Sequence, residues 1–263
     1  MIRKTREVLA AFALLTVMTD PTPLTRAHAH NDYEHARPLE DALEQGFSSV
    51  EADIYLVEGE LRVGHDRKDL VAGRTLEKLY LDPLLERVKA RKGHVYQKAE
   101  RFTLLVDIKA DGEAIYAELR TRLPKYRAML SEYANGRRRS GAVDIVLSGD
   151  RPVKKLVADK RRCMWLDGRL DDDYAGERPS AIAPLVSSSF SPLFSWRGVG
   201  PMSDTDRTKL TDIVSKAHRQ GQQVRFWGAP DKLAAWQLLY NAGVDLINTD
   251  DLKGLASYLR SRS

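Results

Sequence analysis

The amino-acid sequence predicts an α/β protein folded as a single (β/α)₈ TIM barrel. Eight short apolar runs are distributed over residues 24–250, and most of the intervals between them carry apolar residues at helical spacing. The chain has 263 residues, which suits one barrel of this kind and is enough to bury a full core. Strands that alternate with helices favour a parallel sheet, and eight of them favour its closure.

Each expected strand is a short apolar run bounded by small or polar residues. The strands are expected at residues 24–29, 48–56, 102–110, 142–149, 163–168, 183–189, 222–228 and 243–250. The second strand continues through Glu58-Gly59-Glu60, a turn that predicts a hairpin into "LRVGHD". Residues 124–141 and 167–181 are polar and are expected to form long loops.

The helices between the strands follow from apolar spacing and from their end signals. They are expected at residues 38–45, 75–92, 112–123, 204–220, 231–241 and 252–259. Ser203 before the fourth of these and Gly221 after it are typical of a helix start and a helix end.

The first 23 residues have the pattern of an export signal, and the barrel domain is expected over 24–263. Arg3, Lys4 and Arg6 precede an apolar run from Val8 to Met18, which is too short to span a bilayer. This pattern predicts a secreted or periplasmic protein. The alternative is an amphipathic N-terminal helix that stays attached.

The charge of the chain gives little indication of a macromolecular partner. The formal net charge is +5, and basic clusters occur at 137–139, 154–155 and 160–162. They are typical of solvated surface, or of transient contact with an anionic membrane surface. Aromatic residues do not interleave with them, so we expect no nucleic-acid binding. A single cysteine, Cys163, excludes an intrachain disulfide.

The second and third expected strands carry acidic residues on one face. Side chains alternate along a strand, so Glu51 and Asp53 share a face, as do Asp107 and Lys109. Three carboxylates directed into a barrel suit a hard divalent cation such as Mg²⁺ or Ca²⁺. The alternative is a structural network in which these acids pair with Lys or Arg. Lys109 would place a positive charge beside these acids, where it could contact a bound substrate.

Histidines lie near the same end of the predicted barrel. The segment "RAHAHNDYEH" places His28 and His30 at the end of the first strand, and His65 follows the hairpin in "VGHD". A histidine near an acidic cluster is a candidate general acid or base. His28 and His30 are alternatively an H-x-H metal pair.

The ordered segments "HAHNDY", "VEADIYL", "VGHD" and "LLVDIK" resemble the glycerophosphodiester phosphodiesterases and the wider superfamily that includes phosphatidylinositol-specific phospholipase C and sphingomyelinase D. "RTLEKLYLDPL" and "FW" are similar to features of the branch named for altered inheritance of mitochondria. The resemblance covers most of residues 27–252 and implies a phospholipase C-like phosphodiesterase barrel. Two departures are visible, since "HND" replaces the family's H-R-G and Asp107 stands where many relatives have glutamate.

The resemblance implies the chemistry of the site. His30 and His65 correspond to the catalytic pair, and Asn31 is expected beside the phosphate or metal. Glu51, Asp53 and Asp107 correspond to the ligands of one divalent cation. The expected reaction is metal-dependent cleavage of a small-molecule or lipid phosphodiester, of the glycerophosphodiester or phospholipid type. No protein partner is implied.

Arg225 and Trp227 are expected at the carboxyl end of the seventh strand, the end that builds active sites in this fold. Arg225 is expected to face the phosphate and Trp227 to form a wall of the pocket, although ordinary packing also accounts for Trp227.

Two other functions are open at this point. An amidohydrolase-type or polymerase-and-histidinol-phosphatase-type hydrolase would use His28 and His30 as metal ligands, but it needs further strand-end histidines, and only Asp250 fits. A barrel that binds phosphate or lipid head groups without catalysis is the second alternative. We expect His30 to move protons and His28 to shape the strand end.

Overall fold

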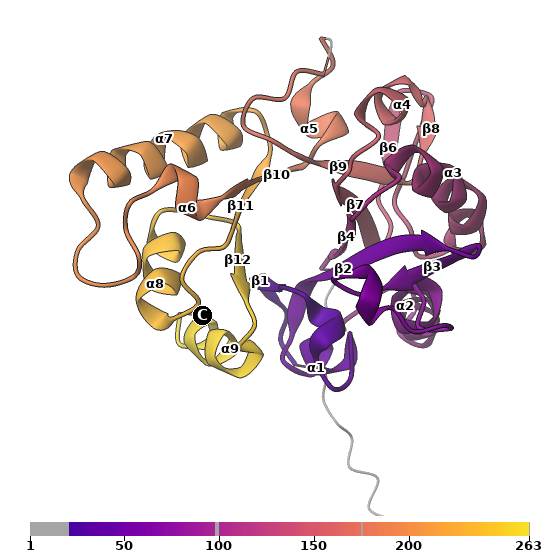
Figure 1. The fold of residues 1–263 in the computed structure, drawn as a ribbon, viewed down its shortest axis with the longest axis horizontal. Coiled ribbons are helices and arrows are strands. Elements are labelled where there is room, and N and C mark those ends of the chain that lie inside the picture. Colours follow the sequence, from indigo (N-terminus) through magenta and orange to yellow (C-terminus); the bar gives the residue numbers. More distant parts are fainter. Residues whose placement is uncertain (1–20, 98–99, 175, 263) are drawn as a thin grey trace, which may run out of the picture.

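The computed structural model describes residues 21–97, 100–174 and 176–262, and residues 1–20 of the expected leader lie outside the described residues. Eight parallel strands form a ring with helices around its outside (Figure 1). The predicted TIM barrel is therefore confirmed. In the order of the ring, the strands are β1 (Leu24–Ala29), β12 (Leu246–Thr249), β11 (Gln223–Trp227), β10 (Leu185–Ser189), β9 (Met164–Gly168), β7 (Val143–Gly149), β4 (Phe102–Ile108) and β2 (Phe47–Val57). Pairing of β1 with β2 closes the ring.

The helices lie on the outer face of the strands (Figure 1). The α-helices are α1 (Glu40–Glu44), α2 (Asp82–Ala90), α3 (Gly112–Arg122), α4 (Val153–Ala158), α5 (Pro179–Ile182), α6 (Phe190–Leu193), α7 (Asp204–Arg219), α8 (Leu233–Asn241) and α9 (Leu252–Arg260). Short 3₁₀ turns occur at Asp32–Glu34, Arg67–Asp69 and Leu123–Tyr126. The helix expected over 75–92 begins with a π turn, Glu77–Leu81, before α2. Within the described ranges, no helix is long and apolar enough to cross a bilayer.

The segment expected to be a long loop at 124–141 contains a hairpin instead. Strands β5 (Glu132–Ala134) and β6 (Arg137–Arg139) pair antiparallel, and β8 (Arg161–Arg162) completes a three-stranded sheet. The turn between β5 and β6 is Asn135-Gly136, with φ angles of 53° and 73°. Positive φ at both positions is typical of a tight hairpin turn, and Asn-Gly is the usual sequence for it. The hairpin predicted after β2 is confirmed, with β3 at Glu60–Val63.

The barrel interior is layered along its axis. At mid-height, four apolar side chains from four strands form their own cluster, and each is at most 3% exposed: Leu105, Val146, Leu185 and Leu246. Each strand's next inward positions toward its carboxyl end are polar, because inward residues recur at every second position. The apolar layer therefore separates a polar carboxyl-end mouth from the amino-terminal end of the barrel.

Candidate active site

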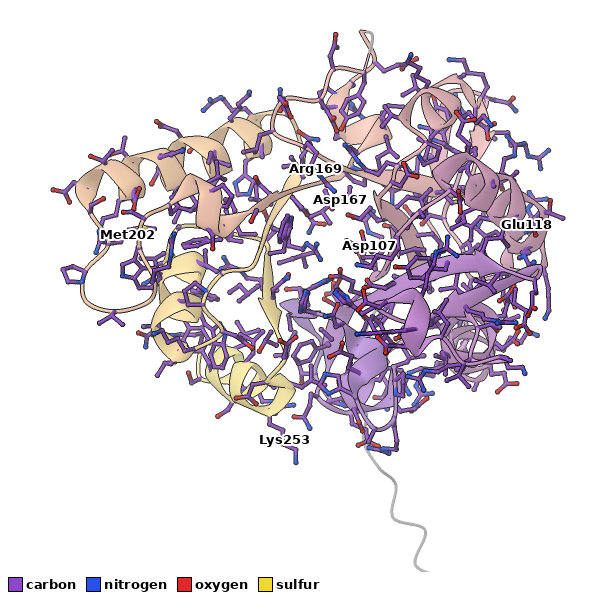
Figure 2. All side chains as sticks on the ribbon, viewed as in Figure 1. Asp107, Glu118, Asp167, Arg169, Met202 and Lys253 are labelled. Carbon is purple, nitrogen blue, oxygen red and sulfur yellow. The ribbon has the colours of Figure 1, made fainter. Side chains whose placement is uncertain are left out.

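The three acids expected as metal ligands lie together at the carboxyl end of the barrel. Asp53 of β2 is directly opposite Asp107 of β4 in the parallel register, and Glu51 lies one inward position deeper. One oxygen from each of the three carboxylates lies within 4.8 Å of the others. Figure 2 shows Asp107 directed toward the centre of the ring, where Asp167 and Arg169 also lie. The two-residue period of β2 and β4 therefore builds the cluster that the sequence predicted.

Two cations contact this acidic cluster. The Nζ atom of Lys109 lies 2.7 Å from Oδ2 of Asp53 and 2.7 Å from Oδ2 of Asp107. The Nη1 atom of Arg225 lies 2.6 Å from Oε2 of Glu51. Burial by itself lowers the pKa of Lys109, but its hydrogen bonds to the two aspartates raise it above the usual range. The structural network that the sequence offered as the alternative, in which these acids pair with Lys or Arg, is thus present at the same place as the candidate metal site.

The acids differ in how well their charge is compensated. For Glu51, burial raises the pKa, but the attraction of Arg225 holds it well below its usual range. For Asp53, burial and repulsion from Glu51 outweigh Lys109, so its pKa is raised. The Oδ1 atom of Asp53 is buried and has no hydrogen-bond partner among the described residues. An uncompensated buried carboxylate oxygen in an all-oxygen cluster fits a hard divalent cation.

His28 lies deep inside the barrel and is fully buried. Its Nδ1 is 2.7 Å from Oγ of Ser49, and its Nε2 is 2.7 Å from Nη1 of Arg225. Burial and the nearby charge of Arg225 lower the pKa of His28 to about 4, so the ring is neutral at pH 7. Since Arg225 can only donate, Nε2 accepts and Nδ1 carries the proton that is donated to Ser49. His28 thus helps to orient Arg225, which forms the ion pair with Glu51.

His30 lies at the mouth, and its side chain is 31% exposed. Its Nδ1 is 2.9 Å from Oδ1 of Asp250, just beyond β12. Burial lowers the pKa of His30, but the hydrogen bond to Asp250 and the charge of Glu51 outweigh this effect and raise it. No described residue forms a hydrogen bond with its Nε2. This arrangement leaves one ring nitrogen available at the mouth.

His65 approaches the cluster from the loop after β3, and its side chain is 54% exposed. Its Nδ1 lies 3.0 Å from Oδ2 of Asp53 and 3.4 Å from the hydroxyl of Tyr33. The buried Tyr33 hydroxyl also donates to Oδ2 of Asp53 at 2.7 Å. No role for Tyr33 was predicted, although this residue follows "HND" directly. Both histidines therefore bind a carboxylate through Nδ1, His65 within the acidic cluster and His30 at Asp250 beyond β12.

The remaining predicted residues lie at different depths. Asn31 adopts left-handed backbone angles, φ 45° and ψ 42°, which asparagine tolerates, and its carbonyl accepts from the backbone N–H of Glu34. Trp227 is 43% exposed at the end of β11. Arg225 is only 3% exposed and lies one inward position below it, where Nε donates to Ser187. Trp227 is thus at the rim as expected, whereas Arg225 belongs to the layer beneath.

Polar residues that the sequence did not single out complete this layer. Asp167 of β9 is fully buried and bonds to Ser148 of β7 and to Arg169, which extends toward the mouth. On β12, both amide atoms of Asn248 are buried without a partner among the described residues. The sequence contained a signal for both residues. Side chains alternate between the two faces of a strand, and in "CMWLDG" and "LINTD" this alternation directs Asp167 and Asn248 into the barrel.

Comparison with known proteins agrees with this fold. A family model described as the AIM6-like phosphodiesterase domain matches residues 16–167, and one for the glycerophosphoryl diester phosphodiesterase family matches residues 223–253. The chain belongs to the AIM6-like phosphodiesterase domain family. Its barrel therefore carries a phosphodiesterase-type domain, as the sequence resemblance predicted.

Relatives of this AIM6-like domain extend over nearly the whole chain. Altered inheritance of mitochondria protein 6 of Eremothecium gossypii is 32% identical, with 94% of this chain and 72% of the relative aligned. The homologue in Arthroderma benhamiae is 28% identical over 90% of this chain and 87% of the relative.

Solved structures with the same fold include two described as glycerophosphodiester phosphodiesterases. One from Parabacteroides distasonis has a TM-score of 0.56 at 17% identity and covers 92% of this chain and 99% of its own. One from Agrobacterium tumefaciens has a TM-score of 0.52 at 17% identity and covers 90% and 99%. At this identity the likeness concerns the fold alone.

Proposed function

We propose that this protein is a phosphodiesterase that uses a divalent cation, Mg²⁺ or Ca²⁺, and two histidines to cleave a glycerophosphodiester or phospholipid-type substrate. The observation that carries the proposal is the placement of His30 and His65. Each is hydrogen-bonded through Nδ1 to a carboxylate: His65 to Asp53 of the acidic cluster, and His30 to Asp250 just beyond β12. Such pairs fix the ring orientation and favour proton transfer through the other nitrogen.

The acidic cluster supports the cation in this proposal. Glu51, Asp53 and Asp107 would hold it, and all three offer oxygen ligands. When bound, a divalent cation there neutralises a phosphoryl oxygen and lowers the pKa of an attacking hydroxyl. Lys109 then contributes positive charge beside the phosphate, where negative charge accumulates in the transition state.

The proton transfers are assigned to the two histidines. His30 removes the proton of the attacking hydroxyl at Nε2, and the carboxylate of Asp250 stabilises the imidazolium that forms. His65, which contacts Asp53 through Nδ1, protonates the leaving oxygen. Asn31 and Trp227, at the mouth, would contact the phosphate and the uncharged part of the substrate. Arg225 acts one layer deeper, through Glu51.

The test is a substrate screen with matched variants. Purified protein is assayed against glycerophosphodiesters, lysophospholipids, sphingomyelin, phosphatidylinositol and bis-p-nitrophenyl phosphate, with EDTA and after addition of Mg²⁺, Ca²⁺ or Zn²⁺. We expect cleavage that EDTA abolishes and that Mg²⁺ or Ca²⁺ restores better than Zn²⁺. His218→Ala is the matched control, because His218 also contacts a carboxylate, Asp245, but lies on α7 outside the mouth.

The same assays discriminate between the alternatives. Stoichiometric Zn²⁺ retained through purification, together with loss of activity in His28→Ala but not in His65→Ala, would indicate the H-x-H hydrolase. Binding of phosphate-bearing ligands with no turnover of any substrate would indicate a non-catalytic barrel.

A further inference from the structure

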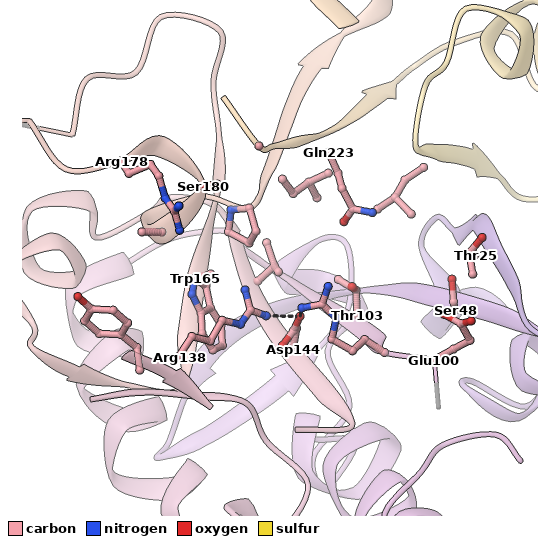
Figure 3. A pocket seen from close by; sticks show the side chains of 18 of the residues that line it. Thr25, Ser48, Glu100, Thr103, Arg138, Asp144, Trp165, Arg178, Ser180 and Gln223 are labelled. Carbon is pink, nitrogen blue, oxygen red and sulfur yellow. Dashed lines mark hydrogen bonds and ion pairs between the residues drawn. The ribbon is translucent and has the colours of Figure 1, made fainter. Parts of the chain in front are cut away.

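The opposite end of the barrel contains a polar cavity that the proposed reaction does not use. It has a volume of about 540 Å³. Among its lining residues are the first inward side chains of several strands, Thr103, Asp144, Trp165 and Gln223 (Figure 3). Along β4, Thr103 precedes Asp107 by four residues, which corresponds to about 13 Å of extended strand.

An apolar layer separates this cavity from the acidic cluster. Val146, Leu185 and Leu246 form its floor, and with Leu105 they make the mid-height cluster of the barrel interior. A substrate in the carboxyl-end mouth therefore has no path through the barrel to this cavity. Any ligand here binds at an independent site.

The walls of the cavity are rich in arginine. Arg101, Arg138 and Arg178 line it, against two carboxylates, Asp144 and Glu100. Asp144 is already engaged, because its Oδ2 lies 2.6 Å from Nη2 of Arg138. The guanidinium of Arg138 also lies 4.2 Å from the ring centroid of Trp165, and Figure 3 shows these two side chains together.

The other two guanidinium groups have donors to spare. Arg101 reaches Asp144 only at 3.9 Å, and its side chain is 57% exposed. The guanidinium of Arg178 forms no hydrogen bond or ion pair with any residue that the structure describes. A guanidinium presents a fork of N–H donors that matches the oxygens of phosphate. The cavity thus offers positive charge without enough internal acid to pair with it.

Uncharged donors surround the same space. The side chains of Thr103, Ser180 and Gln223 line the cavity and form no hydrogen bond within the described part of the chain. Several unpartnered hydroxyl and amide donors suit an anion with many acceptor oxygens better than a carboxylate with two. The apolar floor beneath them suits an uncharged organic group.

We propose that this cavity is a second ligand site, which binds a small phosphorylated organic molecule with its phosphate on Arg101 and Arg178 and its uncharged part on the apolar floor. Cavities of this volume are typical of small-molecule sites. Active sites in this fold lie at the carboxyl end, so this site serves binding and not the phosphodiesterase chemistry.

The test uses phenyl phosphate as the probe and the purified full chain in phosphate-free buffer. Binding is followed through the indole N–H signals of the four tryptophans in ¹H–¹⁵N NMR spectra, with the Trp165 signal assigned from Trp165→Phe. Arg101→Ala/Arg178→Ala removes the proposed contacts. The matched control is the double variant Arg207→Ala/Arg219→Ala. It removes the same amount of charge at two exposed positions of α7 that lie outside the cavity.

We expect phenyl phosphate to shift the Trp165 signal saturably. The Arg101/Arg178 double variant should bind about tenfold more weakly or worse, while the α7 double variant should change affinity less than about twofold. Inorganic phosphate and benzoate should each bind about tenfold more weakly than phenyl phosphate. The proposal is overturned if shifts are confined to Trp227 at the catalytic mouth, if both double variants bind alike, or if inorganic phosphate or benzoate binds as tightly as the probe. The thermal midpoint of each variant shows that it is folded.

Discussion

Lys109 lies between Asp53 and Asp107, and its replacement by methionine distinguishes a cation site from a structural salt-bridge network. The variant keeps an unbranched side chain one atom shorter than lysine and removes its charge. Asp53 is fully buried, and only 14% of the Asp107 side chain is exposed. Without the ammonium, the carboxylates of Asp53 and Asp107 repel each other and the nearby carboxylate of Glu51. Among the contacts described, Arg225 is then the single cation left at the cluster.

The size of the effect follows from this geometry. Removing one partner of a buried ion pair costs about 3–5 kcal/mol. The Lys109 side chain is 21% exposed, and Asp53 keeps its contacts with Tyr33 and His65, so we take the lower end, about 3 kcal/mol. In a domain of this size, about 1 kcal/mol shifts the melting temperature by about 2–4 °C. Lys109→Met should therefore melt about 6–12 °C below wild type in EDTA.

A cation at the cluster changes this outcome. Free Mg²⁺ at about 100 times its dissociation constant stabilises the folded state by about 2.7 kcal/mol, which nearly offsets the loss. Wild type should respond less, because the ammonium of Lys109 competes with the ion for the same oxygens. Thermal melts followed by circular dichroism, in EDTA and in Mg²⁺ or Ca²⁺ at matched ionic strength, measure both effects.

Lys125→Met is the matched control, because Lys125 also pairs with an aspartate, Asp82, but at an exposed position. It should change the melting temperature little and show no added response to Mg²⁺. Equal destabilisation of Lys109→Met with and without divalent ions would refute the cation site and leave the structural network as the explanation of the cluster.

The remaining predictions concern proton transfer, substrate binding and pH. His30→Ala and His65→Ala should each lower kcat by about 10²–10⁴-fold in steady-state assays, and full activity in either would remove that histidine from the mechanism. Asp250→Asn should lower the pKa of His30, because that carboxylate raises it, and so move the acidic limb of the kcat/KM profile to lower pH. Trp227→Ala should raise KM or alter substrate preference with little change in melting temperature, since the ring is 43% exposed; a large fall in melting temperature at constant KM would indicate packing. Burial raises the pKa of Asp32 to about 6, above its unfolded value, so protonation favours the folded state. Wild type should therefore gain about 2 kcal/mol over Asp32→Asn on acidification from pH 7 to 4, measured by urea denaturation.

The fold was predictable because its strands are short apolar runs with clear boundaries. The parts that were missed are short or locally irregular. Helices α4 and α6 have six and four residues, too few for a periodic pattern to stand out. The hairpin of β5 and β6 carried a visible signal, Asn135-Gly136, but the arginine-rich strand after it has no apolar residue to indicate a sheet.

The candidate site was predictable only where one strand or two neighbouring strands decide it. The alternation of side chains was enough to place Glu51, Asp53 and Asp107 on inward faces. The contacts of Asp250 with His30 and of Arg225 with Glu51 span 220 and 174 residues of sequence. They depend on the register with which the barrel closes, and no local pattern determines that register.

The position of β1 in the closed barrel also explains why His28, within this strand, and His30, directly after it, have different properties. In β1, His28 pairs with Asn248 of β12 on one side and with Ser49 of β2 on the other, which fixes its height in the barrel. His30 follows two residues later, about 6.6 Å nearer the mouth along an extended strand. At the deeper position, burial and Arg225 keep the imidazole neutral by lowering its pKa, and both ring nitrogens contact protein atoms. At the mouth, Asp250 raises the pKa of His30 and leaves Nε2 free of described partners. A chelating H-x-H pair needs both rings at one height with free nitrogens, so the closed barrel favours a supporting role for His28 and proton transfer for His30.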